Sequence, residues 1–169
     1  STRKAGDEAT VNLGEITVTG VRAAIEEAIS VKQNSNEIVE TISAILNEHK
    51  LRSGRLELEI TEGVFLADNS ATDETFANLK ALGVRLALDD FGTGYSSLGY
   101  LKKAPFDKIK IDQSFVRGAA VPGNRNAAII KAIVTLANTL YMETTAEGVE
   151  HQDEVELIRE LGCSHIQGY

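Results

Sequence analysis

The chain has 169 residues, enough for one domain with a sizeable apolar core. Its net charge of -8 argues against general binding to polymeric nucleic acid or to a membrane surface, although bound cations can still bring an anionic ligand to an acidic protein. The single cysteine, Cys163, cannot form an internal disulfide, which favours a reducing, cytoplasmic location for this domain. No stretch is apolar and long enough to span a bilayer, so we expect no direct membrane contact, although a longer parent protein could still be membrane-anchored.

The predicted elements alternate regularly from residue 36 onward. Residues 1–27 do not fit this rhythm: 10–13 and 15–20 are strand-like, 21–29 are helix-like, and the segment has no clear role. The pattern then predicts a helix from residue 36, a strand at 56–60, a helix around 73–82, a strand at 84–88, a loop at 91–97, a short helix ended by Pro105, a strand at 108–111, a helix from Asn126, a strand at 142–146, a helix around 155–161 and a last strand at 164–169. Such strand–helix repeats indicate a parallel sheet with right-handed crossovers, either open or closed.

Side-chain alternation favours a closed barrel over an open sheet. Each of three strands places polar residues on one face and apolar residues on the other, with Glu57 and Glu59, Arg85 and Asp89, and Lys108 and Lys110 on the polar faces. An open sheet covered by helices on both sides would be apolar on both faces. We therefore predict an α/β fold of the (βα)8 TIM-barrel type, incomplete because only five to seven strands are found, with residues 1–27 as a separate N-terminal segment and 28–169 as a partial barrel domain. Half-exposed antiparallel strands are the alternative.

Acidic or polar residues follow one predicted strand after another, and this recurrence is the pattern that most directly predicts a site. They are Glu59, Glu62, Asp89, Asp90, Asp112, Glu147, Glu150 and Gln167. The C-terminal ends of parallel strands meet at one rim, where strand–helix folds build their sites. Carboxylates gathered there offer the hard oxygen ligands that divalent cations prefer, so the sequence predicts a metal site.

Five short blocks carry a resemblance to a known family. They are Glu59-Ile60-Thr61-Glu62, residues 89–98, Lys110-Ile111-Asp112, residues 146–150, and Gln167-Gly168-Tyr169 after Gly162-Cys163. In order and spacing these blocks closely resemble the EAL domain family. The resemblance implies a modified TIM-barrel fold and hydrolysis of one phosphodiester bond of cyclic di-GMP to the linear dinucleotide, with Mg2+ or Mn2+ as cofactor.

The resemblance also implies a role for each matching residue. Glu59 matches a direct metal ligand, Asp89 a carboxylate that bridges two metals, and Asp90 a ligand of the second metal. Glu147 matches a residue tied to the second metal and its activated water, and Lys110 matches the catalytic lysine. Supporting or loop-anchoring positions are matched by Glu62, Asp112, Glu150 and Gln167.

The resemblance further implies partners. The loop at 91–97 matches one that couples the metal site to dimerisation, which implies a homodimer. A fused sensor or diguanylate-cyclase domain in a longer parent protein is also expected.

Elementary chemistry favours the same residues, but plainer interpretations stay open. Two metals about 3.5–4 Å apart supply both the nucleophile and the charge relief that phosphodiester hydrolysis needs. A lysine on the inner face of a strand, as expected for Lys110, is costly unless it meets an anion. Asp90 could instead cap its loop, Lys110 could only pair with Asp112, and Glu150 could cap the helix after it. The three histidines show no metal-binding pattern.

The chain departs from the family pattern on its N-terminal side. The Glu-Ala-Leu signature, whose glutamate is a metal ligand, is not found. Counting back from Glu59 puts the family's asparagine ligand near Ala28, which cannot bind metal, and Asn12 is another candidate for that ligand. Three hypotheses therefore remain: a hydrolytic EAL-type domain, a degenerate domain that binds cyclic di-GMP or mediates dimer contacts without hydrolysis, and a metal-dependent TIM-barrel enzyme of other specificity.

Overall fold

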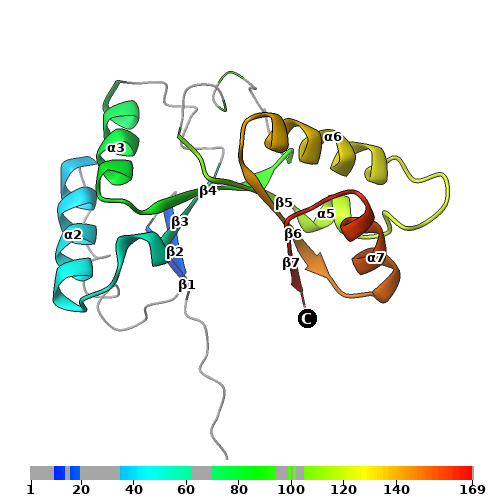
Figure 1. The fold of residues 1–169 in the computed structure, drawn as a ribbon, viewed down its shortest axis with the longest axis horizontal. Coiled ribbons are helices and arrows are strands. Elements are labelled where there is room, and N and C mark those ends of the chain that lie inside the picture. Colours follow the sequence, from blue (N-terminus) through cyan, green and yellow to red (C-terminus); the bar gives the residue numbers. More distant parts are fainter. Residues whose placement is uncertain are drawn as a thin grey trace, which may run out of the picture. The chain divides into compact units, whose positions relative to one another are not determined.

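The computed structural model describes residues 10–13, 16–19, 35–61, 70–93, 99, 101 and 105–168. They belong to two compact units, Ser1–Arg85 and Leu86–Tyr169, each of which is described by itself (Figure 1). The helix predicted at 21–29, Glu62 and most of the loop at 91–97 lie outside the described residues.

Among its described residues, the first unit contains antiparallel strands, two α-helices and one short 3-10 helix. Its elements are β1 (Thr10–Leu13), β2 (Ile16–Thr19), α2 (Ser35–Glu48), η1 (Ser53–Arg55), β3 (Glu57–Thr61) and α3 (Ser70–Ala81). The two strand-like segments near the N-terminus are confirmed as strands, and β2 pairs antiparallel with both β1 and β3. Burial along β3 alternates as predicted, with Leu58 and Ile60 fully buried and Glu57 and Glu59 half-buried.

The second unit is a parallel α/β arrangement. Its elements are β4 (Arg85–Phe91), β5 (Lys108–Ile111), α5 (Gln113–Val116), α6 (Asn126–Thr139), β6 (Glu143–Val149), α7 (Gln152–Glu160) and β7 (His165–Gly168). Strands β4, β5, β6 and β7 pair in that order, and every pair is parallel. The predicted strand–helix alternation is therefore confirmed from β5 to β7, whereas the short helix α5 was not predicted. Most of the short helix predicted before Pro105 lies outside the described residues.

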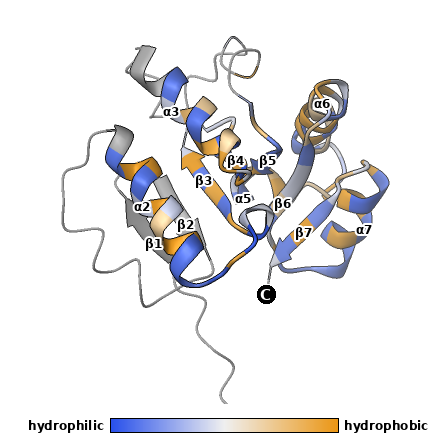
Figure 2. Ribbon diagram, turned by 60° about the vertical axis from the view of Figure 1, so that its left-hand side comes forward, coloured by the Kyte–Doolittle hydropathy of each residue, from blue (hydrophilic) through white to orange (hydrophobic). Residues whose placement is uncertain are grey.

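Apolar spacing explains why these segments form helices on a sheet. Helix α6 buries Ile130, Ile133, Val134 and Ala137, which recur at helical intervals on one face. Colours along α2, α3 and α7 alternate between hydrophilic and hydrophobic, as expected for amphipathic helices (Figure 2). Each large aliphatic side chain buried in this way contributes about 1.5–3 kcal/mol. Among the described residues, no helix is both long enough and apolar enough to cross a membrane.

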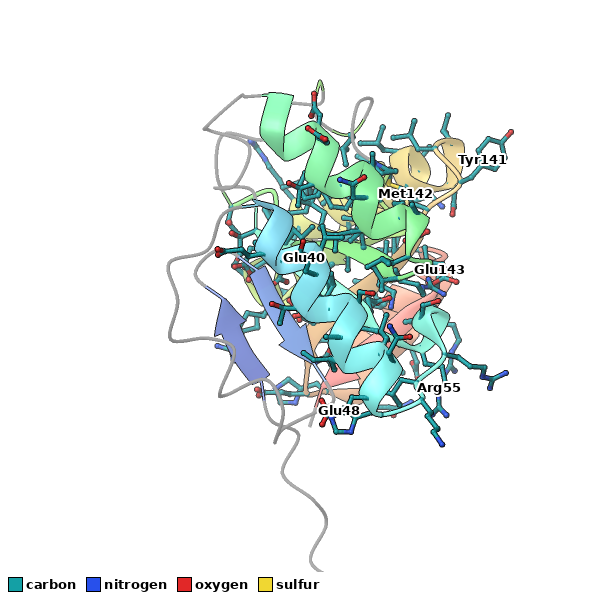
Figure 3. All side chains as sticks on the ribbon, turned by 90° about the vertical axis from the view of Figure 1, so that its left-hand side faces the viewer. Glu40, Glu48, Arg55, Tyr141, Met142 and Glu143 are labelled. Atoms are coloured by element: carbon teal, nitrogen blue, oxygen red, sulfur yellow. The ribbon has the colours of Figure 1, made fainter. Side chains whose placement is uncertain are left out.

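Tyr141, between α6 and β6, has an unfavourable backbone conformation. Its φ is 59°, in the left-handed region that glycine adopts without strain, and the residue is 97% exposed. Figure 3 shows its side chain extending away from the ribbon. The side chain therefore gains almost no burial to offset the strain.

We predict that Tyr141→Gly raises the free energy of unfolding by roughly 0.5–1 kcal/mol, because relief of about 1–2 kcal/mol of strain exceeds the entropy that glycine adds to the unfolded chain. Urea denaturation followed by circular dichroism measures this change. Tyr141→Ala, which keeps the β-carbon, is the matched control and is expected to stay near wild type. Equal stability of the glycine and alanine variants would contradict the strain argument.

Candidate metal centre

The C-terminal end of β4 brings two neighbouring carboxylates to one place. In a regular strand, successive side chains point to opposite faces of the sheet. The register between β4 and β5 shifts between Leu88 and Phe91, and Asp90 has a φ of 52°. This irregularity re-aims the side chain of Asp90, so that Asp89 and Asp90 converge instead of diverging.

Glu147, near the end of β6, completes a cluster of three carboxylates. One oxygen each of Asp89, Asp90 and Glu147 lies within 4.8 Å of the others. Strand β5 lies between the two strands that carry them and contributes Lys110. The Lys110 Nζ lies 3.0 Å from Asp89 Oδ1 and 2.8 Å from Glu147 Oε1, and Lys110 is only 5% exposed. The sequence-predicted residues Asp89, Asp90, Lys110 and Glu147 are thus brought together.

Within the part of the chain that the structure describes, the cluster has more carboxylates than ammonium groups. Three carboxylates lie together, and Lys110 pairs with two of them, Asp89 and Glu147. Partial burial raises the pKa of Asp90 above 3.8, and the charges of Asp89 and Asp112 raise it further, while Lys110 opposes the shift and a hydrogen bond with Asp112 adds to it. An excess of negative charge in a partly dry place is the environment that a cation relieves.

The residues present therefore fit a divalent cation. Converging carboxylate oxygens are the ligands that Mg2+ and Mn2+ prefer, and three carboxylates close together favour a doubly charged ion. Within the described residues, Asp89, Asp90 and Glu147 are the group of side chains close enough together to hold an ion.

Two more of the predicted ligands belong to the first unit. Glu59 on β3 pairs with Thr17 on β2, and Thr17 also pairs with Asn12 on β1. The three residues therefore share one row of the antiparallel sheet. The roles of Glu59 and Asn12 as metal ligands stay predictions, and Glu62 lies outside the described residues.

The supporting residues have structural partners of their own. Asp112 is the N-cap of α5, accepting a hydrogen bond from the Ser114 amide at 2.9 Å. An oxygen of Glu150 lies 3.4 Å from Nη2 of Arg117, and the idea that Glu150 caps α7 is wrong, because His151 is the N-cap of that helix. Gln167 is exposed on β7, beside a register shift between Ala146 and Val149 on β6.

Lys110 and Asp90 do more than form the simple local contacts that the sequence also allows. Lys110 is not merely a partner of Asp112, since its ion pairs join it to Asp89 and Glu147. Asp90 does contact its loop, because its carbonyl accepts hydrogen bonds from the Thr93 amide and hydroxyl, but its carboxylate belongs to the cluster.

Sequence reasoning missed Glu154 and the helix α5. Glu154 is buried, and its carboxylate accepts hydrogen bonds from the amides of Gly118, Glu150 and His151 at 3.2–3.3 Å. The signal for α5 was available: Asp112 followed by Ser114 is a helix N-cap pattern, although a helix of only four residues has little periodicity to detect.

Comparison with known proteins identifies the family. The sequence model described as the EAL domain matches residues 17–169, and this chain belongs to the EAL domain family. Its relatives include the bifunctional diguanylate cyclase/cyclic di-GMP phosphodiesterase MucR of Pseudomonas aeruginosa, which is 41% identical over 132 residues. The match covers 78% of this chain but only 19% of MucR, so the chain spans less than a fifth of the length of that relative.

Solved structures confirm the fold class. A MucR phosphodiesterase structure in complex with c-di-GMP has a TM-score of 0.73 and 38% identity, covering 86% of this chain and 56% of that one. Klebsiella pneumoniae BlrP1, in a manganese/cy-diGMP complex, has a TM-score of 0.71 and 27% identity, covering 80% and 36%. These neighbours are EAL domains of the TIM-barrel type, so the α/β assignment is confirmed and divalent-metal use is supported.

The raised pKa of Asp90 predicts a pH-dependent stability effect in the metal-free protein. A raised pKa means that the folded protein holds this proton more tightly than the unfolded chain does. Ionised Asp90 therefore destabilises the folded state once the pH is above its folded pKa, and the penalty disappears below 3.8. Asp90→Asn should raise the melting temperature in EDTA at pH 7, with the gain shrinking toward pH 3.

Thermal melts across this pH range test the effect. Glu156→Gln removes one exposed carboxylate from α7, away from the cluster, and serves as the charge-matched control. The raised pKa of Asp90 would be contradicted if Asp90→Asn did not raise the melting temperature at neutral pH. It would also be contradicted if the rise in melting temperature were the same in acid.

Proposed function

We propose that this chain is part of an EAL-type domain that hydrolyses one phosphodiester bond of cyclic di-GMP to give the linear dinucleotide, using Mg2+ or Mn2+. The observation that carries the proposal is the buried Lys110 between Asp89 and Glu147, with Asp90 completing the carboxylate cluster. Named relatives act on this substrate, and the cluster offers the ligands and fixed charge that phosphodiester hydrolysis requires.

Each residue of the cluster has a physical task in this proposal. Asp89, Asp90 and Glu147 would hold a divalent cation. Glu59 is proposed as a further metal ligand because it matches a ligand position of the family. A divalent cation bound there supplies charge for the phosphoryl oxygens and lowers the pKa of a coordinated water. The net reaction adds one water across one P–O bond and opens the ring of the substrate.

Lys110 supplies the cation that belongs to the protein itself. Its ion pairs with Asp89 and Glu147 fix the ammonium group beside the place where a phosphodiester would lie. A preorganised charge stabilises developing negative charge without reorganisation during the reaction. Lys110 is therefore proposed as the catalytic lysine, while Glu62, Asp112, Glu150 and Gln167 are proposed to support the ligands and the loop.

One observation favours a second candidate, a degenerate module that binds cyclic di-GMP without hydrolysis. The sequence lacks the Glu-Ala-Leu signature, and with it one expected metal ligand. The cluster of Asp89, Asp90 and Glu147 does not depend on that strand, which favours hydrolysis as the first candidate. The proposal also includes homodimerisation through the loop at 91–97, a fused regulatory domain in the parent protein, and a cytoplasmic location, where an unpaired cysteine is ordinary.

We predict that the chain converts cyclic di-GMP to the linear dinucleotide in Mn2+ and that Lys110→Met lowers kcat by about a hundredfold or more, because a preorganised charge is removed. Chromatographic assay of the product measures turnover, and thermal melts verify folding. Lys131→Met is the matched control, because Lys131 is exposed on α6 and contacts the Leu161 carbonyl.

Binding of cyclic di-GMP in Ca2+, measured beside turnover, separates the hypotheses. Tight binding without product in Mn2+ would contradict the enzyme and favour the degenerate module. Absence of saturable binding in either metal would contradict both. Product from another phosphoester alone would favour a metal-dependent barrel enzyme of other specificity.

A further inference from the structure

The short helix α5 touches both strand ends that carry the carboxylate cluster. Gly92 follows Asp90 by two residues, and a β-carbon built on it would lie 2.9 Å from Cε2 of Phe115. Gly148 directly follows Glu147, and a β-carbon there would lie 2.6 Å from Cβ of Gln113. Both glycines have positive φ, 96° and 65°, so each approach uses a backbone shape that other residues adopt only with strain.

The position of α5 is itself fixed at both of its ends. At its N-terminus, Asp112 caps the helix by accepting a hydrogen bond from the Ser114 amide. Beyond its C-terminus, the Gly118 amide donates to the buried carboxylate of Glu154, which also holds the two amides at the start of α7. The turn that follows α5 borders a cavity of about 480 Å³ lined partly by Gly118, Gly148 and Glu154. These contacts and the fully buried side chain of Val116 hold this helix in place.

We infer that α5 sets the spacing between the carboxylates of β4 and β6, and that Phe115 and Gln113 are positioning residues for the metal centre. The inference deepens the proposed function and rests on it. Phe115 supports the backbone just after Asp90, and Gln113 supports the backbone just after Glu147. Because one rigid turn of helix carries both contacts, the distance between the two strand ends is set by the helix rather than by either loop alone.

A matched pair of substitutions tests this inference through metal affinity. Phe115 lies beyond the C-terminal end of β5, and Phe106 lies before its N-terminal end. Phe115→Leu should weaken Mn2+ binding about tenfold, which is the loss typical of residues that orient metal ligands. Phe106→Leu makes the same change in a buried ring and should leave Mn2+ affinity at the wild-type value while lowering the melting temperature. Mn2+ binding is measured by electron paramagnetic resonance of the free ion.

The outcomes separate the inference from the proposed function. Wild-type affinity in Phe115→Leu, or an equal loss in both leucine variants, would overturn the positioning role while leaving the metal centre in place. Failure of the wild-type chain to bind Mn2+ at all would overturn the proposed function and the inference together.

A second pair of variants tests the contact between α5 and β6. This test does not depend on the folding of the phenylalanine variants. Gly148→Ala should weaken Mn2+ binding, because the new methyl group collides with Gln113. Adding Gln113→Gly removes the colliding atom and should restore part of the affinity, although the strain at φ 65° stays. An affinity that does not recover in the double variant would contradict the contact as the cause.

Discussion

The ion pairs of Lys110 with Asp89 and Glu147 are the interactions on which the site depends. A buried ammonium group costs several kcal/mol unless charged partners compensate it, and two carboxylates at hydrogen-bond distance do so here. The carboxylates outnumber the ammonium group, because Asp90 adds a third carboxylate, whose pKa is raised by burial and by its acidic neighbours. The protein therefore stabilises its lysine and at the same time leaves an excess of negative charge, which is the condition that favours a divalent cation beside a fixed positive group.

Backbone irregularity is what converts a parallel sheet into this arrangement. Regular strands would send Asp89 and Asp90 to opposite faces, and the register shift on β4 with a left-handed Asp90 brings them together. A comparable shift on β6 is accompanied by Gly148, whose missing side chain admits α5. Both departures from ideal geometry lie next to the cluster, as expected where a fold trades regularity for function. The parallel sheet brings the strand ends to one edge, while the register shifts and the glycines orient the carboxylates.

The sequence was most informative where chemistry and periodicity coincide. Long amphipathic patterns such as that of α6, and alternation along β3, predicted elements that the structure confirms. Acidic residues after successive apolar strands predicted the partners of Lys110, since parallel strands end at one rim. The left-handed conformation of Asp90 and the three amides held by Glu154 depend on tertiary contacts and leave no periodic trace. Helix α5 was missed because four residues make barely one turn, and the antiparallel pairing of β1 and β2 was missed because neither short strand carries a pattern that fixes its neighbour.

Anomalous scattering from a crystal grown in Mn2+ tests the central claim most directly, because it locates the ion without reference to turnover. We expect a manganese peak coordinated by carboxylate oxygens of Asp89, Asp90 and Glu147, with the Lys110 ammonium group beside it and outside the coordination sphere. A well-ordered cluster without a peak at saturating Mn2+, or manganese bound only elsewhere on the chain, would contradict it.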